Sequence, residues 1–178
     1  MAAVDRSVKG INAHLRACGS LFRVRKRSPS TLRLLRDMQC EEWEADVFDF
    51  NDHIMVIDRG SPGRAVAMVE YILLGTRKLT LYVATSCTER GYRRTGLSSL
   101  LRLVLFMSAR QLGCVRIASE AVTAESKRML AGMGFASCKR TFHGYPYNMV
   151  LRTDGHAFAK LLRRMLRSVG ACELPPSS

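Results

Sequence analysis

The sequence predicts an α/β fold with a mixed, mostly antiparallel sheet of six or seven strands flanked by helices, plus a C-terminal amphipathic helix. Three observations support this prediction. Apolar and polar residues alternate along several short segments, one helical segment is apolar almost all round, and glycine-containing turns separate the segments. The 178 residues suffice for one hydrophobic core and are too few for two comfortable ones, so we expect one domain with modest tails.

The first part of the chain predicts an edge strand followed by a helix. Phe22 and Val24 alternate with Arg23 and Arg25, which fits a half-buried strand over residues 21–27. Ser28 as N-cap and Pro29 in the first turn indicate the start of a helix over residues 29–43. Residues 44–52 are acidic and predict an irregular segment or a short second helix.

The middle of the chain predicts a hairpin, a strand and a buried helix. A Ser-Pro-Gly turn joins two apolar segments within residues 53–75, and another strand follows over residues 78–88. Residues 95–113 are apolar almost all round, so this helix should be buried against the sheet. The rest predicts, in order, a strand, a helix, two strands and the amphipathic helix: residues 114–122, 124–135, 136–142, 146–152 and 155–169.

The cysteines and the N-terminal residues indicate the cellular compartment in which we expect the protein. The six cysteines are widely spaced, with no Cys-x-x-Cys and no nearby histidine pair, so we expect reduced thiols and no metal site. Residues 1–19 lack the apolar core of a secretory signal, and no apolar run is long enough to span a membrane. These features predict an intracellular protein of the cytoplasm, with the nucleus left open.

The formal net charge of +13 is unevenly distributed. Residues 1–36 sum to +8, residues 37–76 to −7 and residues 77–178 to +12. Such a division suits a polyanionic ligand on one half and a cationic ligand on the other, although solvated helix faces and loops would produce it too. The basic runs at residues 23–27 and 160–167 could contact nucleic acid or a membrane surface, but a strand edge and a solvated helix face are the preferred explanations.

The segment from Tyr92 to Leu101 carries the strongest functional signal. A strand leads into a turn at Gly96, and the turn becomes the first turn of the buried helix. The first N–H groups of a helix have no internal partner, and its dipole adds positive charge, so this turn can hold a pyrophosphate. Arg93 and Arg94 supply countercharge.

The motif Arg93-x-x-Gly96-x-Ser98 resembles the signature of the GNAT superfamily of acetyl-CoA-dependent N-acetyltransferases, Arg/Gln-x-x-Gly-x-Gly/Ala. The element order over residues 20–152 is similar too. A second family motif, Asn-x-x-Ala-x-x-x-Tyr-x-x-x-Gly-Phe, is degenerate: its Gly-Phe is kept as residues 134–135, whereas Leu130 replaces the tyrosine.

The resemblance implies three regions and a donor. Residues 1–19 would be an N-terminal tail or short helix, residues 20–152 a GNAT-like acyl-CoA-binding domain, and residues 153–178 a basic amphipathic helix and tail. Acetyl-CoA would be the donor substrate, with its pantetheine arm inserted as a pseudo-strand between residues 86–88 and 117–119. The residues expected to bind it are Ser86, Cys87, Thr88, Arg93, Arg94, Thr95, Gly96, Leu97, Ser98 and Ser99.

The catalytic candidates are two carboxylates and a tyrosine. An amine acceptor arrives protonated, so a carboxylate or a water chain must remove a proton before attack. Glu120, at the end of a strand, is the preferred base and Glu70 the second choice, although both positions also fit solvated residues. Because Leu130 replaces the family's tyrosine, the proton for the departing thiolate would come from another group. The candidate donors are Tyr145, which we select, and Tyr82, His143 and Tyr147.

Three functions remain open at this stage. The first is acetyl transfer to a primary amine by direct attack, with a cationic or lysine-bearing acceptor suggested by the acidic middle of the chain. The second is a catalytically degenerate GNAT-like module that binds or regulates a protein partner. The third is a basic factor associated with nucleic acid. Only the net positive charge supports this function, and charge alone does not identify the ligand.

Overall fold

The computed structural model describes residues 2–26, 28–36, 38, 52–58, 63–142 and 144–169. The strands are β1 Phe22–Lys26, β2 Asp52–Asp58, β3 Arg64–Leu74, β4 Thr80–Thr88, β5 Arg116–Ser119, β6 Ala136–Phe142 and β7 Tyr145–Arg152. The helices are α1 Ala2–Ala17, α2 Pro29–Arg36, α3 Leu97–Gln111, α4 Ala124–Gly132 and α5 Gly155–Val169, with a 3₁₀ turn, η2, at Arg90–Tyr92.

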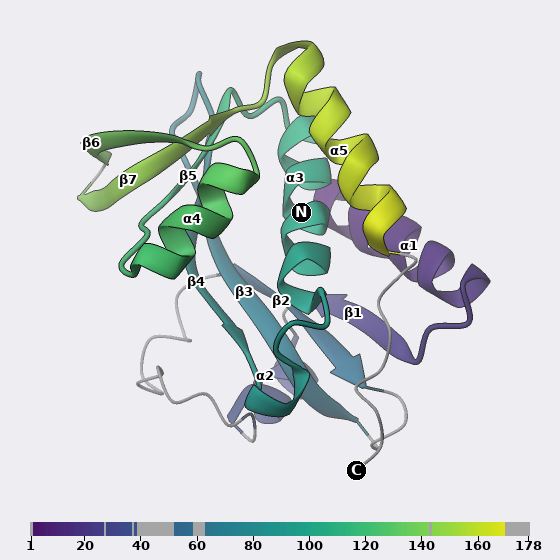
Figure 1. Ribbon diagram of the computed structural model, residues 1–178. Helices are drawn as coiled ribbons and strands as arrows, with labels where there is room; N and C mark the ends of the chain where they lie inside the picture. Colours follow the sequence, from purple (N-terminus) through teal and green to yellow (C-terminus); the bar gives the residue numbers. More distant parts are fainter. Residues whose placement is uncertain are drawn as a thin grey trace.

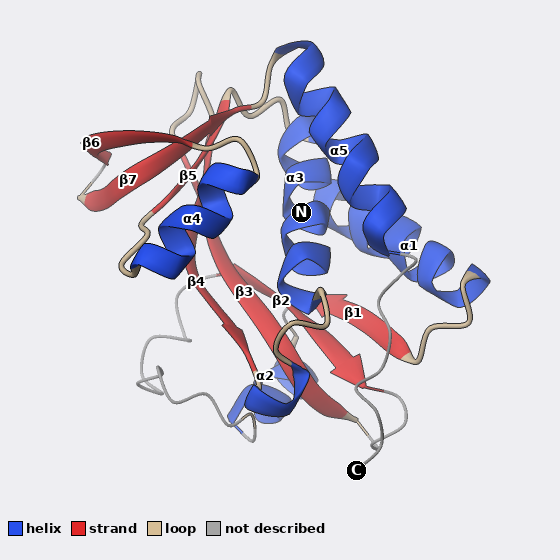
Figure 2. Ribbon diagram, viewed as in Figure 1, coloured by secondary structure: helices blue, strands red, loops and turns tan. Residues whose placement is uncertain are grey.

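The strands form one seven-stranded sheet in the order β1-β2-β3-β4-β5-β7-β6 (Figure 1). Neighbouring strands are antiparallel except β4 and β5, which are parallel and joined through α3. α1, α3 and α5 cover one face of the sheet, and α2 lies on the other (Figure 2). The predicted α/β fold, with its mostly antiparallel sheet and C-terminal helix, is therefore confirmed.

The N-terminal segment is a full helix. α1 has 16 residues and buries Val4, Ile11 and Leu15, which recur on one helical face. Its Asn12 side chain satisfies both backbone groups of one residue of β1: Nδ2 donates to the carbonyl of Val24 at 2.9 Å, and Oδ1 accepts from the Val24 N–H at 2.8 Å. An amphipathic helix thus covers the edge strand, which limits pairing with another chain.

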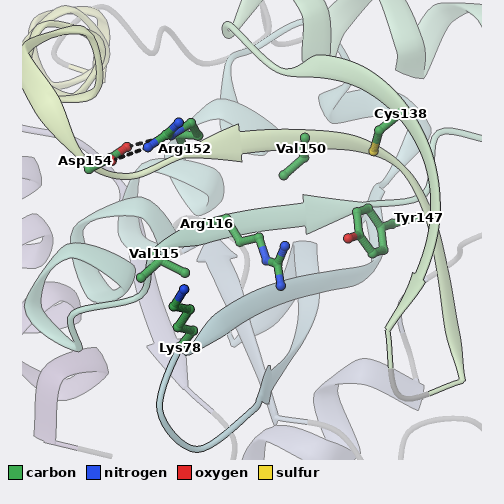
Figure 3. Close-up of a pocket in the computed structure, with 8 residues that line it drawn as sticks. All are labelled: Lys78, Val115, Arg116, Cys138, Tyr147, Val150, Arg152 and Asp154. Carbon is green, nitrogen blue, oxygen red and sulfur yellow. Dashed lines mark hydrogen bonds and ion pairs between the residues drawn. The ribbon is translucent and has the colours of Figure 1, made fainter.

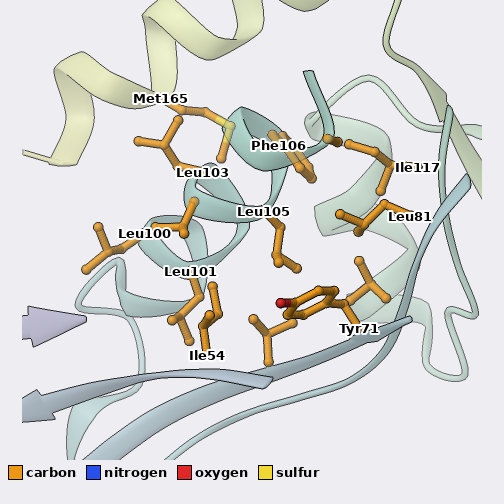
Figure 4. Close-up of a cluster of buried hydrophobic side chains, with 14 of the residues drawn as sticks. Ile54, Tyr71, Leu81, Leu100, Leu101, Leu103, Leu105, Phe106, Ile117 and Met165 are labelled. Atoms are coloured by element: carbon orange, nitrogen blue, oxygen red, sulfur yellow. The ribbon is translucent and has the colours of Figure 1, made fainter. Parts of the chain in front are cut away.

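α3 is the central helix, packed between the sheet and α5. Leu101 and Leu105 lie toward Ile54 and Tyr71 of the sheet, while Met165 of α5 lies on the opposite side of α3 (Figure 4). Ten of the fifteen residues of α3 are buried, so the prediction of a helix buried against the sheet is confirmed. The rigid seating of α3 fixes the position of its N-terminal turn.

Several elements differ from the predicted boundaries, among them α4, which ends at Gly132 rather than at residue 135. β5 ends at Ser119, three residues before the predicted end, because it pairs with β4 only as far as Ser119 and the chain then turns into the N-cap of α4 at Thr123. The helix predicted over residues 29–43 is seen as α2 up to residue 36. Residues 37 and 39–51, with most of the acidic segment, lie outside the described residues.

The C-terminal helix α5 has an apolar and a basic side. Phe158, Leu161, Leu162 and Met165 are buried, whereas the basic residues predicted for a contact face are directed away from this apolar side. No helix in the described ranges combines the length and the apolar character needed to cross a membrane.

The cysteines depart from the prediction at one position. Cys18, Cys114 and Cys138 are free, as expected. Cys87 is disulfide-bonded, so the prediction of reduced thiols throughout is wrong there. Its bonding partner lies outside the described residues, since the other three described cysteines are free. The wide spacing in sequence could not reveal a bridge, because the fold brings distant segments together.

The free cysteines should differ strongly in reactivity. Burial raises the pKa of the Cys114 thiol from 9.0 to about 11, and the thiolate is the reactive form. At pH 8 we expect iodoacetamide to modify exposed Cys18 at least about 100-fold faster than Cys114. Peptide mass spectrometry over a time course measures both rates. Equal rates would show that the segment around Cys114, between α3 and β5, opens readily.

Candidate functional site

A cleft opens where two parallel strands separate. β4 and β5 pair from Thr80 opposite Arg116 to Val83 opposite Ser119, and β4 then continues alone on this side to Thr88. The pairing of β3 with β4 shifts register between Val69 and Tyr71, leaving two residues of β4 opposite one of β3, which is a β-bulge. The unpaired edge of β4 therefore offers backbone N–H and C=O groups to a ligand.

The cleft between these strands has a volume of about 540 Å³. α3 contributes one wall and α4 another. Its lining is mainly small, polar or aliphatic: Val83, Ala84, Thr85, Ser86, Arg102, Ser119, Glu120, Val122, Thr123, Ser126, Met129 and Leu130. A slender extended chain that bonds to the β4 edge fits such a cleft.

The candidate anion cradle is the turn at the start of α3, over residues 93–99. Gly96, the N-cap, has φ 84° and Arg94 has φ 68°, so two residues of this turn are left-handed. The first helical hydrogen bond runs from the Leu100 N–H to the Gly96 carbonyl at 2.9 Å, which leaves the N–H groups of residues 97–99 outside the helical ladder. Such N–H groups bind phosphate oxygens.

Hydrogen bonds hold this turn in place. The Tyr92 hydroxyl donates to Asp58 Oδ2 at 2.7 Å, and the Thr95 hydroxyl donates to the Tyr92 carbonyl at 2.5 Å. Arg64 of β3 forms an ion pair with Glu89, just before η2. The turn is thus anchored to β2 and β3 and is organised before any ligand arrives.

The predicted donor-binding residues lie at the end of β4 and in the turn that leads into α3. Ser86 lines the cleft, the Thr88 carbonyl accepts a hydrogen bond from Arg93 Nε at 3.3 Å, and the turn over residues 93–99 carries the rest. Cys87 is placed differently: its side chain packs in the cluster of Leu35 and Met68 on the opposite face. Only the backbone of Cys87 can therefore contact a ligand in the cleft.

The predicted catalytic residues fall in two places. Glu120 is exposed and lines the cleft. Tyr145 is 37% exposed, and its ring lies 5.2 Å from that of Tyr82. Burial raises the pKa of Tyr82, and the nearby Glu120 and Tyr145 raise it further, so these three groups lie near one another, although of the three only Glu120 lines the cleft. Glu70 is 1% exposed on β3, opposite His53 of β2, and is not among the residues that line the cleft.

The structure also adds a residue that sequence reasoning missed. Arg102 of α3 lines the cleft although it is only 4% exposed. Its Nη2 donates to the Ser86 hydroxyl at 3.0 Å, and burial lowers its pKa to about 10. The sequence did contain a signal for this residue: Arg102 stands between Leu101 and Leu103 in a helix that is apolar almost all round. Most faces of such a helix contact other elements, so an arginine within it can be buried.

A second pocket, of about 550 Å³, lies over β5 and β7 away from the cleft. In Figure 3 the Arg152–Asp154 pair occupies one end, and Tyr147 and Cys138 the other, with Lys78 and Arg116 between. Arg152 donates two hydrogen bonds to Asp154, at 3.0 and 2.7 Å, and Arg116 Nε donates to the Thr80 hydroxyl at 2.9 Å. Two of its three cations thus already have partners within the protein, whereas the cleft lies beside an unpaired strand edge and is lined in part by α3.

Comparison with solved structures gives the fold a name. Arabidopsis thaliana NAA60 in complex with acetyl-CoA aligns with a TM-score of 0.61 at 16% identity, covering 75% of this chain and 99% of that one. The ribosomal-protein-S18-alanine N-acetyltransferase of Escherichia coli aligns with a TM-score of 0.57 at 14% identity, covering 76% and 96%. A GNAT-family acetyltransferase from Staphylococcus aureus Mu50 aligns with a TM-score of 0.59 at 11% identity, covering 75% and 99%.

The chain thus has the fold of these structures, the GNAT fold, as the motif at residues 93–98 predicted. No protein-family model matches the sequence, and no curated protein does so either. At identities of this size, structural likeness shows the fold alone, and the chemistry has to be argued from the site.

Proposed function

We propose that this protein is an acetyl-CoA-dependent N-acetyltransferase that acetylates a primary amine by direct attack. The observation that carries the proposal is that α3, whose first N–H groups lie outside the helical ladder, also lines the cleft beside the unpaired edge of β4, where its Arg102 donates a hydrogen bond to Ser86. A pyrophosphate at the turn and an extended pantetheine arm along β4 fit this geometry. The acyl thioester then reaches the narrow end, where β4 and β5 meet.

In a mechanism of direct attack, the groups at the end of the cleft where β4 and β5 meet have defined roles. Backbone N–H groups freed by the bulge in β4 would polarise the acyl carbonyl. Glu120, exposed at the cleft, is the carboxylate best placed to take the proton from the incoming amine. Tyr145 lies near Glu120 through its ring contact with Tyr82. The Tyr82 hydroxyl itself donates a hydrogen bond to the Pro146 carbonyl at 3.0 Å.

We further propose that the acceptor is cationic, such as a polyamine or a lysine-bearing peptide. The support is the net charge of −7 over residues 37–76, between segments of +8 and +12. Acidic groups near an acceptor groove raise the local concentration of cations. Structural neighbours with peptide or amine ligands include the NatC complex bound to Gag peptide and CoA, aligned at 15% identity with a TM-score of 0.57.

Two measurements test the proposal in sequence. Acetyl-CoA should raise the melting temperature, and release of free CoA thiol should then follow addition of a cationic amine.

Neutralising Glu41, Glu42 and Glu44 together should raise the acceptor KM several-fold, leave acetyl-CoA affinity nearly unchanged, and reduce the salt dependence of KM.

The control variant neutralises Asp5 and Asp154, which are solvent-exposed and far from the cleft, and it should change neither parameter. If acetyl-CoA binds but no amine releases CoA, the second candidate holds: a GNAT-like module that binds acyl-CoA without turnover. Leu130, buried in the cleft wall where the resembling family has tyrosine, is the observation that favours it.

A further inference from the structure

Arg102 is an unusual residue for the interior of a protein. It is 4% exposed and sits in α3 between Leu101 and Leu103, both fully buried. Its Nη2 is bonded to Ser86, but Nε and Nη1 are buried without a hydrogen-bond partner among the described residues. A buried charge without a counterion is costly, so natural proteins keep such groups chiefly where a ligand or a reaction uses them.

The position of Arg102 relates it to the reacting end of the donor. It follows the first residue of α3 by five positions, about 8 Å along the helix from the phosphate cradle. Its partner Ser86 comes directly after the two bulged residues of β4, close to where β4 and β5 separate. A donor that runs from the cradle toward this junction brings its thioester sulfur near the guanidinium.

Resting on the proposed function, we propose that Arg102 is a catalytic residue that stabilises the thiolate of CoA as it leaves. In the step concerned, the amine nitrogen forms a bond to the acyl carbon and the C–S bond breaks. The electron pair of that bond remains on sulfur, and the proton of the amine passes to Glu120 or to water. The negative charge on sulfur then develops beside a cation whose Nε and Nη1 groups have no acceptor among the described residues.

The charges around the cleft favour this role. Of the residues that line it, the charged ones are Arg102 and Glu120; the lining residues of β4 and α4 are uncharged. Glu120 raises the pKa of a nearby thiol and Arg102 lowers it. Arg102 itself, with a pKa of about 10, remains protonated at neutral pH despite its burial. Leu130 supplies no proton, so electrostatic stabilisation takes the place of protonation.

The test measures the thiol pKa of bound CoA by the ultraviolet absorbance of the thiolate. In the native protein this pKa should lie at least about one unit below its value in Arg102→Met, which corresponds to about a tenfold change in the ionisation equilibrium. Arg102→Lys should keep part of the shift, and Glu120→Gln should lower the pKa further. Arg110→Met, an exposed arginine of the same helix, should leave it unchanged.

Kinetics separate this role from a structural one. Arg102→Met should lower kcat by roughly 10²-fold while the Kd of acetyl-CoA changes less than about threefold, because acetyl-CoA carries no thiolate. The melting temperature should not fall, since methionine replaces an unpaired buried charge.

Two outcomes would overturn the proposal. The first is an equal thiol pKa in the native protein and in Arg102→Met. The second is a preference for succinyl-CoA over acetyl-CoA that Arg102→Met abolishes without moving the thiol pKa, which would assign the guanidinium to the acyl chain. Absence of CoA binding to the native protein is a separate result, and it contradicts the acetyltransferase assignment itself.

Discussion

Gly96→Val should lower the affinity for acetyl-CoA by roughly 100-fold or more, equivalent to about 2.7 kcal/mol. Gly96 has φ 84°, a conformation that a β-branched residue adopts only with strain, and it caps the helix whose first N–H groups form the cradle. Valine would force the turn to rearrange and move these N–H groups away from the phosphates. Isothermal titration with acetyl-CoA measures the loss.

Gly91→Val is the matched control. Gly91 lies in the same loop, within η2, but it is not among the glycines with positive φ, and a Cβ there would meet nothing within 4 Å. We therefore expect its affinity for acetyl-CoA to remain within about threefold of the native value. If both variants bind equally well, the phosphates are held elsewhere and the cradle assignment is wrong.

Phe106→Ala should produce the largest loss of stability, about 3 to 5 kcal/mol in the free energy of unfolding. Phe106 is fully buried at the centre of α3, and its ring lies 6.0 Å from that of Phe135 and 6.1 Å from that of Phe158. Removing it leaves a cavity where α3, the start of β6 and α5 meet. Since small domains are stable by about 5 to 15 kcal/mol, urea denaturation should resolve this change easily.

The control for this cavity is Leu166→Ala on α5. Leu166 is 39% exposed, so its truncation should cost less than about 1 kcal/mol. If Phe106→Ala costs as little as Leu166→Ala, α5 does not pack on α3 in solution. Acetyl-CoA affinity of the folded Phe106→Ala protein should change little, because the ring is part of the core and does not line the cleft.

The sequence pattern predicted those elements whose structure depends only on residues close together in the chain. Alternation around Phe22 and Val24 identified an edge strand, and the continuous apolar character of residues 95–113 identified a buried helix. Gly96 after a strand and before that helix identified the turn that binds phosphate in our proposal, because free N–H groups at a helix start require only local geometry. The boundaries of β5 were predicted less well, because pairing with β4 decides where it ends.

The sequence by itself determined the fold class, the order of the strands along the chain and the position of the glycine turn that we propose as the anion cradle, since these follow from periodicity and turn chemistry. Tertiary structure alone decided that β4 and β5 separate after Val83 and Ser119, that Glu120 lines the cleft while Glu70 does not, and that Arg102 is buried there. The physical reason is register and packing between distant segments. An arginine in a helix is equally compatible with solvent and with a buried cleft until the neighbouring elements are in place.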